Sequence, residues 1–151
     1  MRIERLGAVG TVADVLRAVA AATRDRELPP PAALTGDWFG SAAVIAPSVA
    51  VRPVDPAEVF DAVPGGRRDA VGGGWIGYLS YPDAGVDGHP PRVPEAAGGW
   101  TDCVLRLDHE GCWWYESLTD ATLPGWITAA LVAAPPRLEW EIDWAEPDYD
   151  Q

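Results

Sequence analysis

The side chains best suited to chemistry are two histidines and two cysteines, and their spacing argues against a catalytic site. His89 lies in a stretch rich in proline and glycine, and His109 lies in a predicted turn. Neither belongs to a metal-ligand pattern such as H-x-x-x-H or C-x-x-C. A hydrolytic nucleophile would need a tight elbow of the G-x-S-x-G kind, which the sequence lacks. We therefore expect both histidines to be surface turn residues.

The cysteines, Cys103 and Cys112, flank a probable hairpin turn over residues 108–111. A two-residue loop at 109–110 places Leu107 opposite Cys112 and Cys103 opposite Glu116. That separation is too large for a disulfide. We expect both cysteines to be reduced and structural, which is the common state of a buried free cysteine.

Gly72, Gly74 and Gly77 formally satisfy G-x-G-x-x-G. A dinucleotide site needs a strand before that motif and a helix after it. Here the glycines precede a strand rich in tryptophan and tyrosine, and no apolar strand leads into them. The pattern favours a structural interpretation, in which the glycines permit close approach of backbone at the entry to a strand.

Two charged groups are also candidates for binding. The doublet Arg67-Arg68 has the chemistry to grip a phosphate or a partner carboxylate, although a solvated loop is the simpler interpretation. Glu139 and Glu141 lie on one face of an alternating strand pattern. We interpret them as a solvated face and not as a glycosidase-like acid pair.

The overall charge restricts the partners. The formal net charge is −12, and the isoelectric point is near 4.3. This argues against nucleic acid and anionic membranes, which need clustered positive charge. All eleven basic residues are arginine, so a Schiff-base or P-loop lysine is excluded. No targeting segment and no apolar run of roughly 18–20 residues is visible, so we expect a cytoplasmic protein.

The pattern of apolar and turn residues predicts one domain over residues 1–151. The predicted fold class is α+β, with a mainly antiparallel β-sheet and a few short helices packed on it. The predicted helices are Thr11–Thr23 with a near capping box of Thr11 and Asp14, a helix from Asp55 to about Ala62, and Pro124–Ala133. The predicted strands are Ala32–Thr35, Ala42–Ala46 and Val49–Val54 around a turn at Pro47-Ser48, Trp75–Tyr81, the hairpin Trp100–Asp108 with Cys112–Leu118, and Arg137–Trp144, while Pro82–Gly99 is predicted to be an irregular loop.

Two segments carry a family resemblance. The first is GGWIGYLSY over Gly73–Tyr81, and the second runs from Asp102-x-Val104-Leu105 to WWYE at residues 113–116. In this order and spacing they resemble the N-terminal domain of the chorismate-utilising enzymes, aminodeoxychorismate synthase component I and anthranilate synthase component I. The resemblance extends from about Pro31 to the end of the sequence and is nearest to aminodeoxychorismate synthases of actinobacterial type.

The resemblance implies two sets of site residues. Some family members hold tryptophan in a pocket marked by Leu-x-Glu-Ser, and the matching positions here are Leu34, Thr35, Gly36, Ser41 and Ala42. The acid and the serine of that motif are absent, which argues against feedback binding of tryptophan. The implied structural motif and partner contact comprises Gly73, Gly74, Trp75, Gly77, Tyr78 and Tyr81. After Tyr81 the family usually continues Asp-x-Gly, whereas this chain has Pro82-Asp83-Ala84-Gly85.

The resemblance also implies that catalysis belongs to a different domain. The family's magnesium-binding glutamates and catalytic lysine belong to a C-terminal catalytic domain, so no catalytic residue and no cofactor carries over to this chain. The implied function is that of a non-catalytic subunit of a split aminodeoxychorismate synthase. Its expected partners are a chorismate-binding catalytic subunit, which would hold magnesium, and a glutamine amidotransferase subunit. Three alternatives stay open: the equivalent anthranilate synthase subunit, a free-standing sensor of tryptophan-like amino acids, and a fragment of a longer enzyme.

Overall fold

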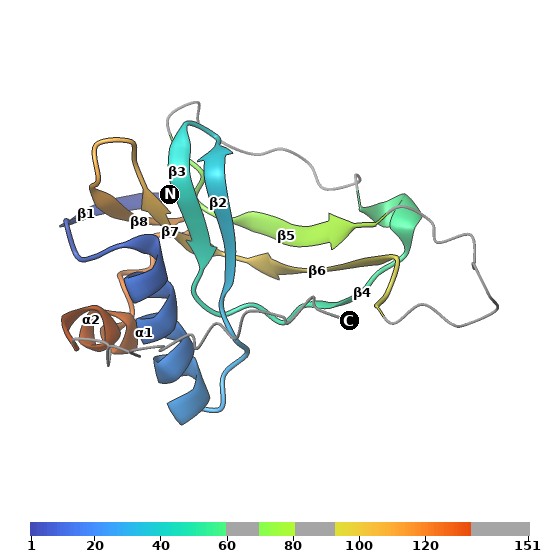
Figure 1. The fold of residues 1–151 in the computed structure, drawn as a ribbon, viewed down its shortest axis with the longest axis horizontal. Coiled ribbons are helices and arrows are strands. Elements are labelled where there is room, and N and C mark those ends of the chain that lie inside the picture. Colours follow the sequence, from blue (N-terminus) through green and yellow to red (C-terminus); the bar gives the residue numbers. More distant parts are fainter. Residues whose placement is uncertain (60–69, 81–92, 134–151) are drawn as a thin grey trace, which may run out of the picture.

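The computed structural model describes residues 1–59, 70–80 and 93–133 (Figure 1). Within these ranges the chain forms eight strands, two α-helices and one short 3-10 helix, and every strand pairing is antiparallel. The predicted α+β class with a mainly antiparallel sheet is confirmed. In chain order the elements are β1 (Arg2–Gly7), α1 (Val12–Asp25), β2 (Ala32–Trp38), β3 (Ser41–Ala46), β4 (Arg52–Pro53), the 3-10 helix (Pro56–Glu58), β5 (Gly74–Leu79), β6 (Ala96–Thr101), β7 (Cys103–Leu107), β8 (Trp113–Ser117) and α2 (Gly125–Val132).

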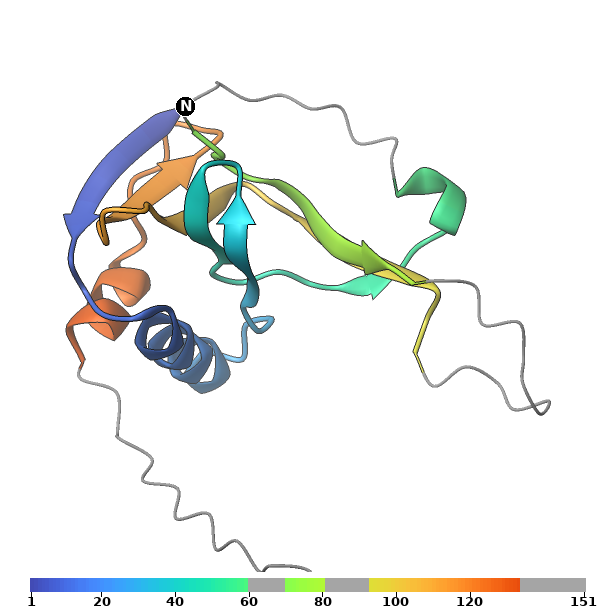
Figure 2. The same cartoon turned by 45° about the horizontal axis from the view of Figure 1, so that its top comes forward.

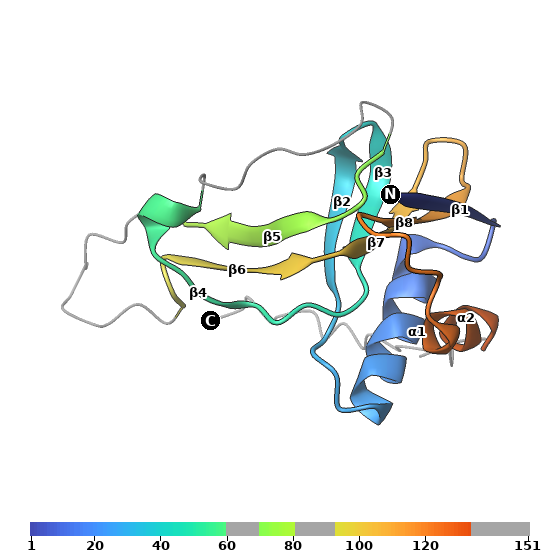
Figure 3. The ribbon, with the colours of Figure 1, turned by 180° about the vertical axis from the view of Figure 1, so that it is seen from behind.

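The strands form two sheets. One has five strands in the order β1-β8-β7-β3-β2, and the other has three in the order β4-β6-β5. Only Asp102 separates β6 from β7, so the chain passes from one sheet to the other at a single corner. Both α-helices lie against the five-stranded sheet, and the three-stranded sheet projects away from them (Figures 1 and 2). The view from behind shows the same separation (Figure 3).

The core lies between the helices and the five-stranded sheet. Its fully buried members come from both helices and from the three central strands. They are Val15, Val19, Ile45, Leu105, Trp113, Tyr115 and Ile127. The buried indole of Trp113 donates a hydrogen bond to the Gly10 carbonyl at 2.8 Å, which satisfies its one polar atom. Helical spacing in α1 and strand alternation in β7 and β8 thus converge on one core.

The start of α1 confirms the predicted capping box. The Thr11 hydroxyl accepts a hydrogen bond from the Asp14 amide, and the Asp14 carboxylate accepts one from the Thr11 amide, both at 3.2 Å. Each side chain therefore satisfies an amide that the first turn leaves free. The helix ends at Asp25, two residues beyond the predicted end. Helix α2 and strand β3 lie within one residue of their predicted bounds, and β2 extends three residues beyond its predicted end at Thr35.

The predicted partner of β3 is wrong. Residues Val49–Val54 were expected to fold back on β3, but only Arg52–Pro53 form a strand, and β4 pairs with β6 in the other sheet. The Val49 amide instead donates to the Pro30 carbonyl at 3.2 Å, and Pro53 has no amide with which to extend a ladder. The next predicted helix start is confirmed, because the Asp55 carboxylate caps the Ala57 amide at 2.9 Å. Its predicted end lies outside the described residues.

The β7–β8 hairpin forms, but its predicted register is off by one residue. Leu107 pairs with Trp113, and Cys103 pairs with Ser117. The loop has three residues, because Gly111 adopts a left-handed conformation at φ 84° and adds one position to the turn. Both cysteines are free, as predicted. In both the predicted and the observed register, Cys103 is not paired with Cys112 across the hairpin.

Strands β1, β6 and β7 also differ from the predicted strands. Strand β1, which pairs with β8, was not predicted, and the segment predicted as a loop over Pro82–Gly99 contains the first residues of β6. The predicted strand Trp100–Asp108 is in fact two strands that meet at Asp102. There the Asp102 carbonyl accepts the Leu118 amide at 2.8 Å, which fixes the corner. The predicted strand Arg137–Trp144 lies outside the described residues.

Candidate functional site

The five residues expected to line a ligand pocket all lie in the β2–β3 hairpin, but they do not share one face of the sheet. The register places Leu34 and Ala42 on one face and Thr35 and Ser41 on the other. Leu34 and Ala42 are half-buried, Thr35 and Gly36 are exposed, and Ser41 is completely buried. Of these five, only Ser41 therefore carries a side-chain polar group that is shielded from water.

The Ser41 hydroxyl is the unusual feature of this hairpin. It has an exposed fraction of 0% and, among the residues that the structure describes, no hydrogen-bond partner. No other buried side-chain nitrogen or oxygen in those ranges is left without a partner. A buried hydroxyl in this state costs about 1–3 kcal/mol. A polar group bound beside it would remove that cost.

The glycine segment before β5 is confirmed as a place of close backbone approach. Gly72 has φ 74°, a left-handed conformation that favours glycine. A Cβ atom on Gly73 would lie 2.5 Å from the Thr101 carbonyl oxygen, inside contact distance. These glycines let the chain pass close to the corner where β6 becomes β7, against Leu118. Since no helix follows them, the dinucleotide interpretation has no structural basis here.

Glu116 on β8 holds this glycine segment in place. Its carboxylate is completely buried and accepts hydrogen bonds from the amides of Val71 at 2.6 Å and Gly72 at 2.9 Å. The other oxygen is 2.5 Å from the Arg106 guanidinium, which lies 5.9 Å from the Trp114 ring centroid. Three of the roughly four acceptor positions of this carboxylate are thus used inside the chain, and both oxygens are engaged. Glu116 is a structural link between the two sheets and not a substrate-binding group.

Sequence reasoning did not identify this buried pair. Glu116 was noted only as part of the hairpin, and the predicted register placed it opposite Cys103. In the true register Glu116 lies opposite Val104, diagonal to Arg106 on the same face. The sequence did contain a signal for this ion pair: Arg106 and Glu116 are opposite charges on the two arms of an otherwise apolar hairpin.

Of the residues expected to contact a partner, the three-stranded sheet carries Gly74, Trp75, Gly77 and Tyr78. Leu79 and Trp100, which lie beside them, were not among the expected residues. Trp75 on β5 pairs with Trp100 on β6. Leu79 lies four residues after Trp75 on β5, and alternate residues of a strand point to the same side, so these three side chains share a face. Gly77 and Gly98 lie beneath the Trp75 ring, which leaves no room for a Cβ atom at either position. Leu79 and Trp100 remain 42% and 57% exposed.

Tyr78 lies on the opposite face of this sheet. Its hydroxyl donates to the Pro94 carbonyl at 3.1 Å. Gly73 immediately precedes β5 and Gly74 begins it, so they position the strand and have no side chain to present. Tyr81, Arg67, Arg68 and His89 lie outside the described residues.

Burial raises the pKa of two groups on the β7–β8 hairpin, Cys103 and Tyr115. Burial raises the pKa of the Cys103 thiol above its ordinary value of 9.0, so the protonated and weakly nucleophilic form prevails near neutral pH. Burial likewise raises the pKa of Tyr115, whose hydroxyl lies 3.3 Å from the Ala121 carbonyl oxygen. His109 is an exposed turn residue, as predicted, and lies 3.6 Å from Asp37.

Residues 1–59, 70–80 and 93–133 contain no group of three or more histidine, cysteine or acidic side chains placed to hold a metal ion. The helices found there are also too short or too polar to cross a lipid bilayer.

The fold defines the class of protein as an antiparallel α+β domain with a helix-covered sheet and a smaller projecting sheet. No protein-family model, no curated protein and no solved structure matches this chain.

Proposed function

We propose that this chain is a non-catalytic subunit of an aminodeoxychorismate synthase, in which it completes and stabilises a separate chorismate-binding catalytic chain. The proposal starts from the resemblance carried by GGWIGYLSY and by the later hairpin. The catalytic chain would hold magnesium and convert chorismate to 4-amino-4-deoxychorismate, on the route to p-aminobenzoate and folate. A glutamine amidotransferase chain would supply ammonia. We place the assembly in the cytoplasm.

The observation that supports this proposal is the apolar face of the projecting sheet. Trp75, Leu79 and Trp100 share that face, and two of them are exposed to solvent. Large aromatic side chains in such positions are typical of interface hot spots. In the described residues both α-helices lie on the other sheet, so neither covers this face (Figure 3). A catalytic chain packed on it would remove the exposed apolar surface from water.

The test is reconstitution with the chorismate-binding protein encoded beside this chain. We expect a stable complex, and chorismate-plus-ammonia turnover only when both chains are present. Leu79→Asp would disrupt the complex, because it places a charge on the apolar face. Val132→Asp is the matched control, since Val132 is 80% exposed on α2. A catalytic chain that is fully active alone and does not bind this chain would refute the proposal.

A second candidate function, a sensor of tryptophan-like amino acids, is favoured by the unsatisfied hydroxyl of Ser41. Calorimetry with the chain alone should then detect saturable binding of an aromatic amino acid. Ser41→Ala should weaken that binding while it stabilises the free chain, because the substitution removes an unpaired buried hydroxyl. Flat titrations with all the aromatic amino acids would exclude the sensor.

A further inference from the structure

The tip of the β2–β3 hairpin has a specific turn geometry. Strand β2 ends at Trp38, which pairs with Ser41, and a loop of only two residues, Phe39-Gly40, joins the strands. Both loop residues have positive φ, 53° and 69°. Positive φ at both central positions defines a type I′ turn, whose twist matches that of the flanking strands. This turn strongly favours asparagine, aspartate or glycine at its first position.

Phe39 is therefore expected to make the hairpin less stable than asparagine, aspartate or glycine would at the same position. A bulky residue with positive φ is a conformational outlier. Within the described ranges only Glu27 and Phe39 combine a side chain with positive φ, and Glu27 lies just after a helix, where such conformations are common. The Phe39 ring is 77% exposed, so burial within the chain does little to offset the strain. Residues that depart from local conformational preferences in this way are typically found at functional positions.

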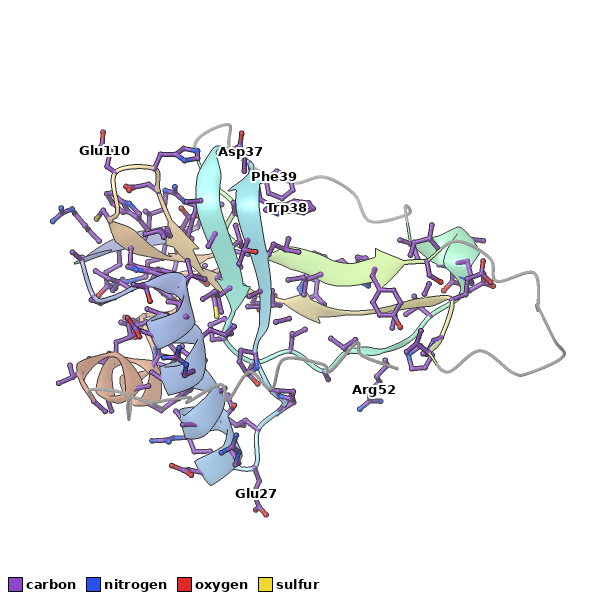
Figure 4. The ribbon with its side chains drawn as sticks, viewed as in Figure 1. Glu27, Asp37, Trp38, Phe39, Arg52 and Glu110 are labelled. Carbon is purple, nitrogen blue, oxygen red and sulfur yellow. The ribbon has the colours of Figure 1, made fainter. Side chains whose placement is uncertain are left out.

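Trp38 extends the same apolar tip. Its ring is 42% exposed, and its indole donates to the Thr35 carbonyl at 3.0 Å, which fixes the orientation of the side chain. The Trp38 and Phe39 ring centroids are 6.4 Å apart. A bulge at Gly36-Asp37 precedes them, where two residues of β2 oppose one residue of β3. Both aromatic side chains lie to one side of the tip, and Asp37 points away from them (Figure 4).

The charges around the tip are acidic. Asp37 is 82% exposed, and Glu110 lies on the neighbouring β7–β8 turn at the same end of the sheet (Figure 4). The whole chain carries a formal charge of −12. An anionic membrane and a second copy of the chain would both be repelled. A protein surface with basic side chains around an apolar pocket is complementary to this tip.

We propose that Phe39, supported by Trp38, is an anchor that inserts into an apolar pocket with a basic rim on the chorismate-binding catalytic chain. The anchor forms a second contact, separate from the projecting sheet, and its choice of partner rests on the proposed function. The backbone strain and the exposure of the ring are then retained because the partner buries the ring.

The test substitution is Phe39→Asn, which places a preferred residue in the type I′ turn and removes the ring. In the free chain we expect the melting temperature to rise by about 2–4 °C, the shift that follows from relief of mild strain in a chain of this size. In titrations against the chorismate-binding chain we expect affinity to fall by about 30-fold, as for loss of an aromatic hot spot. Val132→Asn, an equally exposed position on α2, should leave affinity unchanged.

Each outcome decides the proposal. A more stable variant that binds weakly supports the anchor. Equal affinity of wild type and Phe39→Asn overturns the anchor and leaves the proposed function intact. A variant that loses both melting temperature and affinity shows that Phe39 serves the fold and also overturns it. Absence of any complex with the wild-type chain refutes the proposed function together with the partner named here.

Discussion

At the scale of single residues, Glu116 makes the most demanding set of interactions in the described chain. Its buried carboxylate joins an arginine on β7 to two backbone amides of the segment that leads into β5. A buried ion pair seldom adds much stability compared with apolar residues of the same size. Loss of one partner is severe, however, because the other charge stays buried. The pair thus fixes where the two sheets meet.

Glu116→Gln should lower the free energy of unfolding by about 3 kcal/mol, because it leaves the Arg106 guanidinium nearly buried without a counter-charge. Urea unfolding measures the change. The double variant Glu116→Gln/Arg106→Met should recover much of the loss. Glu110→Gln, at an exposed turn position, is the control and should change stability by less than about 0.5 kcal/mol. A similarly small effect for Glu116→Gln would contradict the assigned role.

Asp108 provides a pH-dependent prediction. Its carboxylate accepts hydrogen bonds from the Trp114 indole and from the Cys112 amide, and these bonds lower its pKa below the ordinary 3.8. The folded state therefore binds the proton less readily than the unfolded state, so the stabilisation is present above pH 3.8 and is lost as pH falls through the folded-state pKa. The stability difference between wild type and Asp108→Asn should be largest near neutral pH and should shrink in acid. A constant difference from pH 7 to pH 2 would contradict this account.

At the scale of elements, β5 and β6 depend on glycines that face each other. Gly77 pairs with Gly98, and the Trp75 ring lies over both. Glycine ordinarily weakens a strand, since it costs entropy and packs nothing. Here it allows a tryptophan to lie flat on the sheet, so the aromatic side chain covers backbone that would otherwise be open to water.

Gly77→Ala should destabilise the chain by about 1–3 kcal/mol, the usual cost of overpacking, because the new methyl group meets the Trp75 ring and the Ala97 carbonyl oxygen. The measurement is thermal or chemical unfolding. Gly125→Ala is the matched control. Gly125 lies in α2 with no atom near its Cβ position, so alanine there should stabilise the chain by about 0.5–1 kcal/mol. Equal effects of the two substitutions would rule out the packing argument.

The elements predicted from sequence are those whose signals are local. Helix α1 is predicted by its apolar spacing and by the Thr11 cap, and β8 by the turn at residues 108–111 that precedes it. The first four residues of β6, Ala96–Gly99, were predicted as loop because adjacent glycines are typical of loops. Gly98 lies under the Trp75 ring and Gly99 against the Ala50 carbonyl oxygen, contacts that the sequence does not reveal. The register of β7–β8 was off by one, because the left-handed conformation of Gly111 adds a loop residue.

The candidate site was predictable only in part. The five expected pocket residues lie in one hairpin because they are near one another in sequence, but strand alternation divides their side chains between its two faces. The contact between Glu116 and the amides of residues 71 and 72 joins positions more than forty residues apart. The strained turn at Phe39 was also missed, because the sequence WFG does not look like a type I′ turn.

At the scale of the whole molecule, the dominant feature is an excess of acidic residues. The chain carries 23 acidic and 11 basic residues. Few of these charges are neutralised by contact in the described ranges, where the ion pairs include the buried one at Glu116 and a small number at the surface. Self-repulsion of this kind destabilises the compact state and favours oppositely charged partners.

The free chain should consequently become more stable as sodium chloride rises from about 0.05 to 0.5 M at pH 7, because the Debye length falls and repulsion is screened. Urea unfolding at each salt concentration measures the effect. The gain should nearly vanish close to pH 4.3, where the formal charge approaches zero. In a complex with a basic partner the same salt should slow association, because screening weakens the attraction that steers the two chains together. Stability that falls with salt at pH 7 would mean that favourable surface ion pairs outweigh the net repulsion, and the argument for a basic partner would then lose its electrostatic basis.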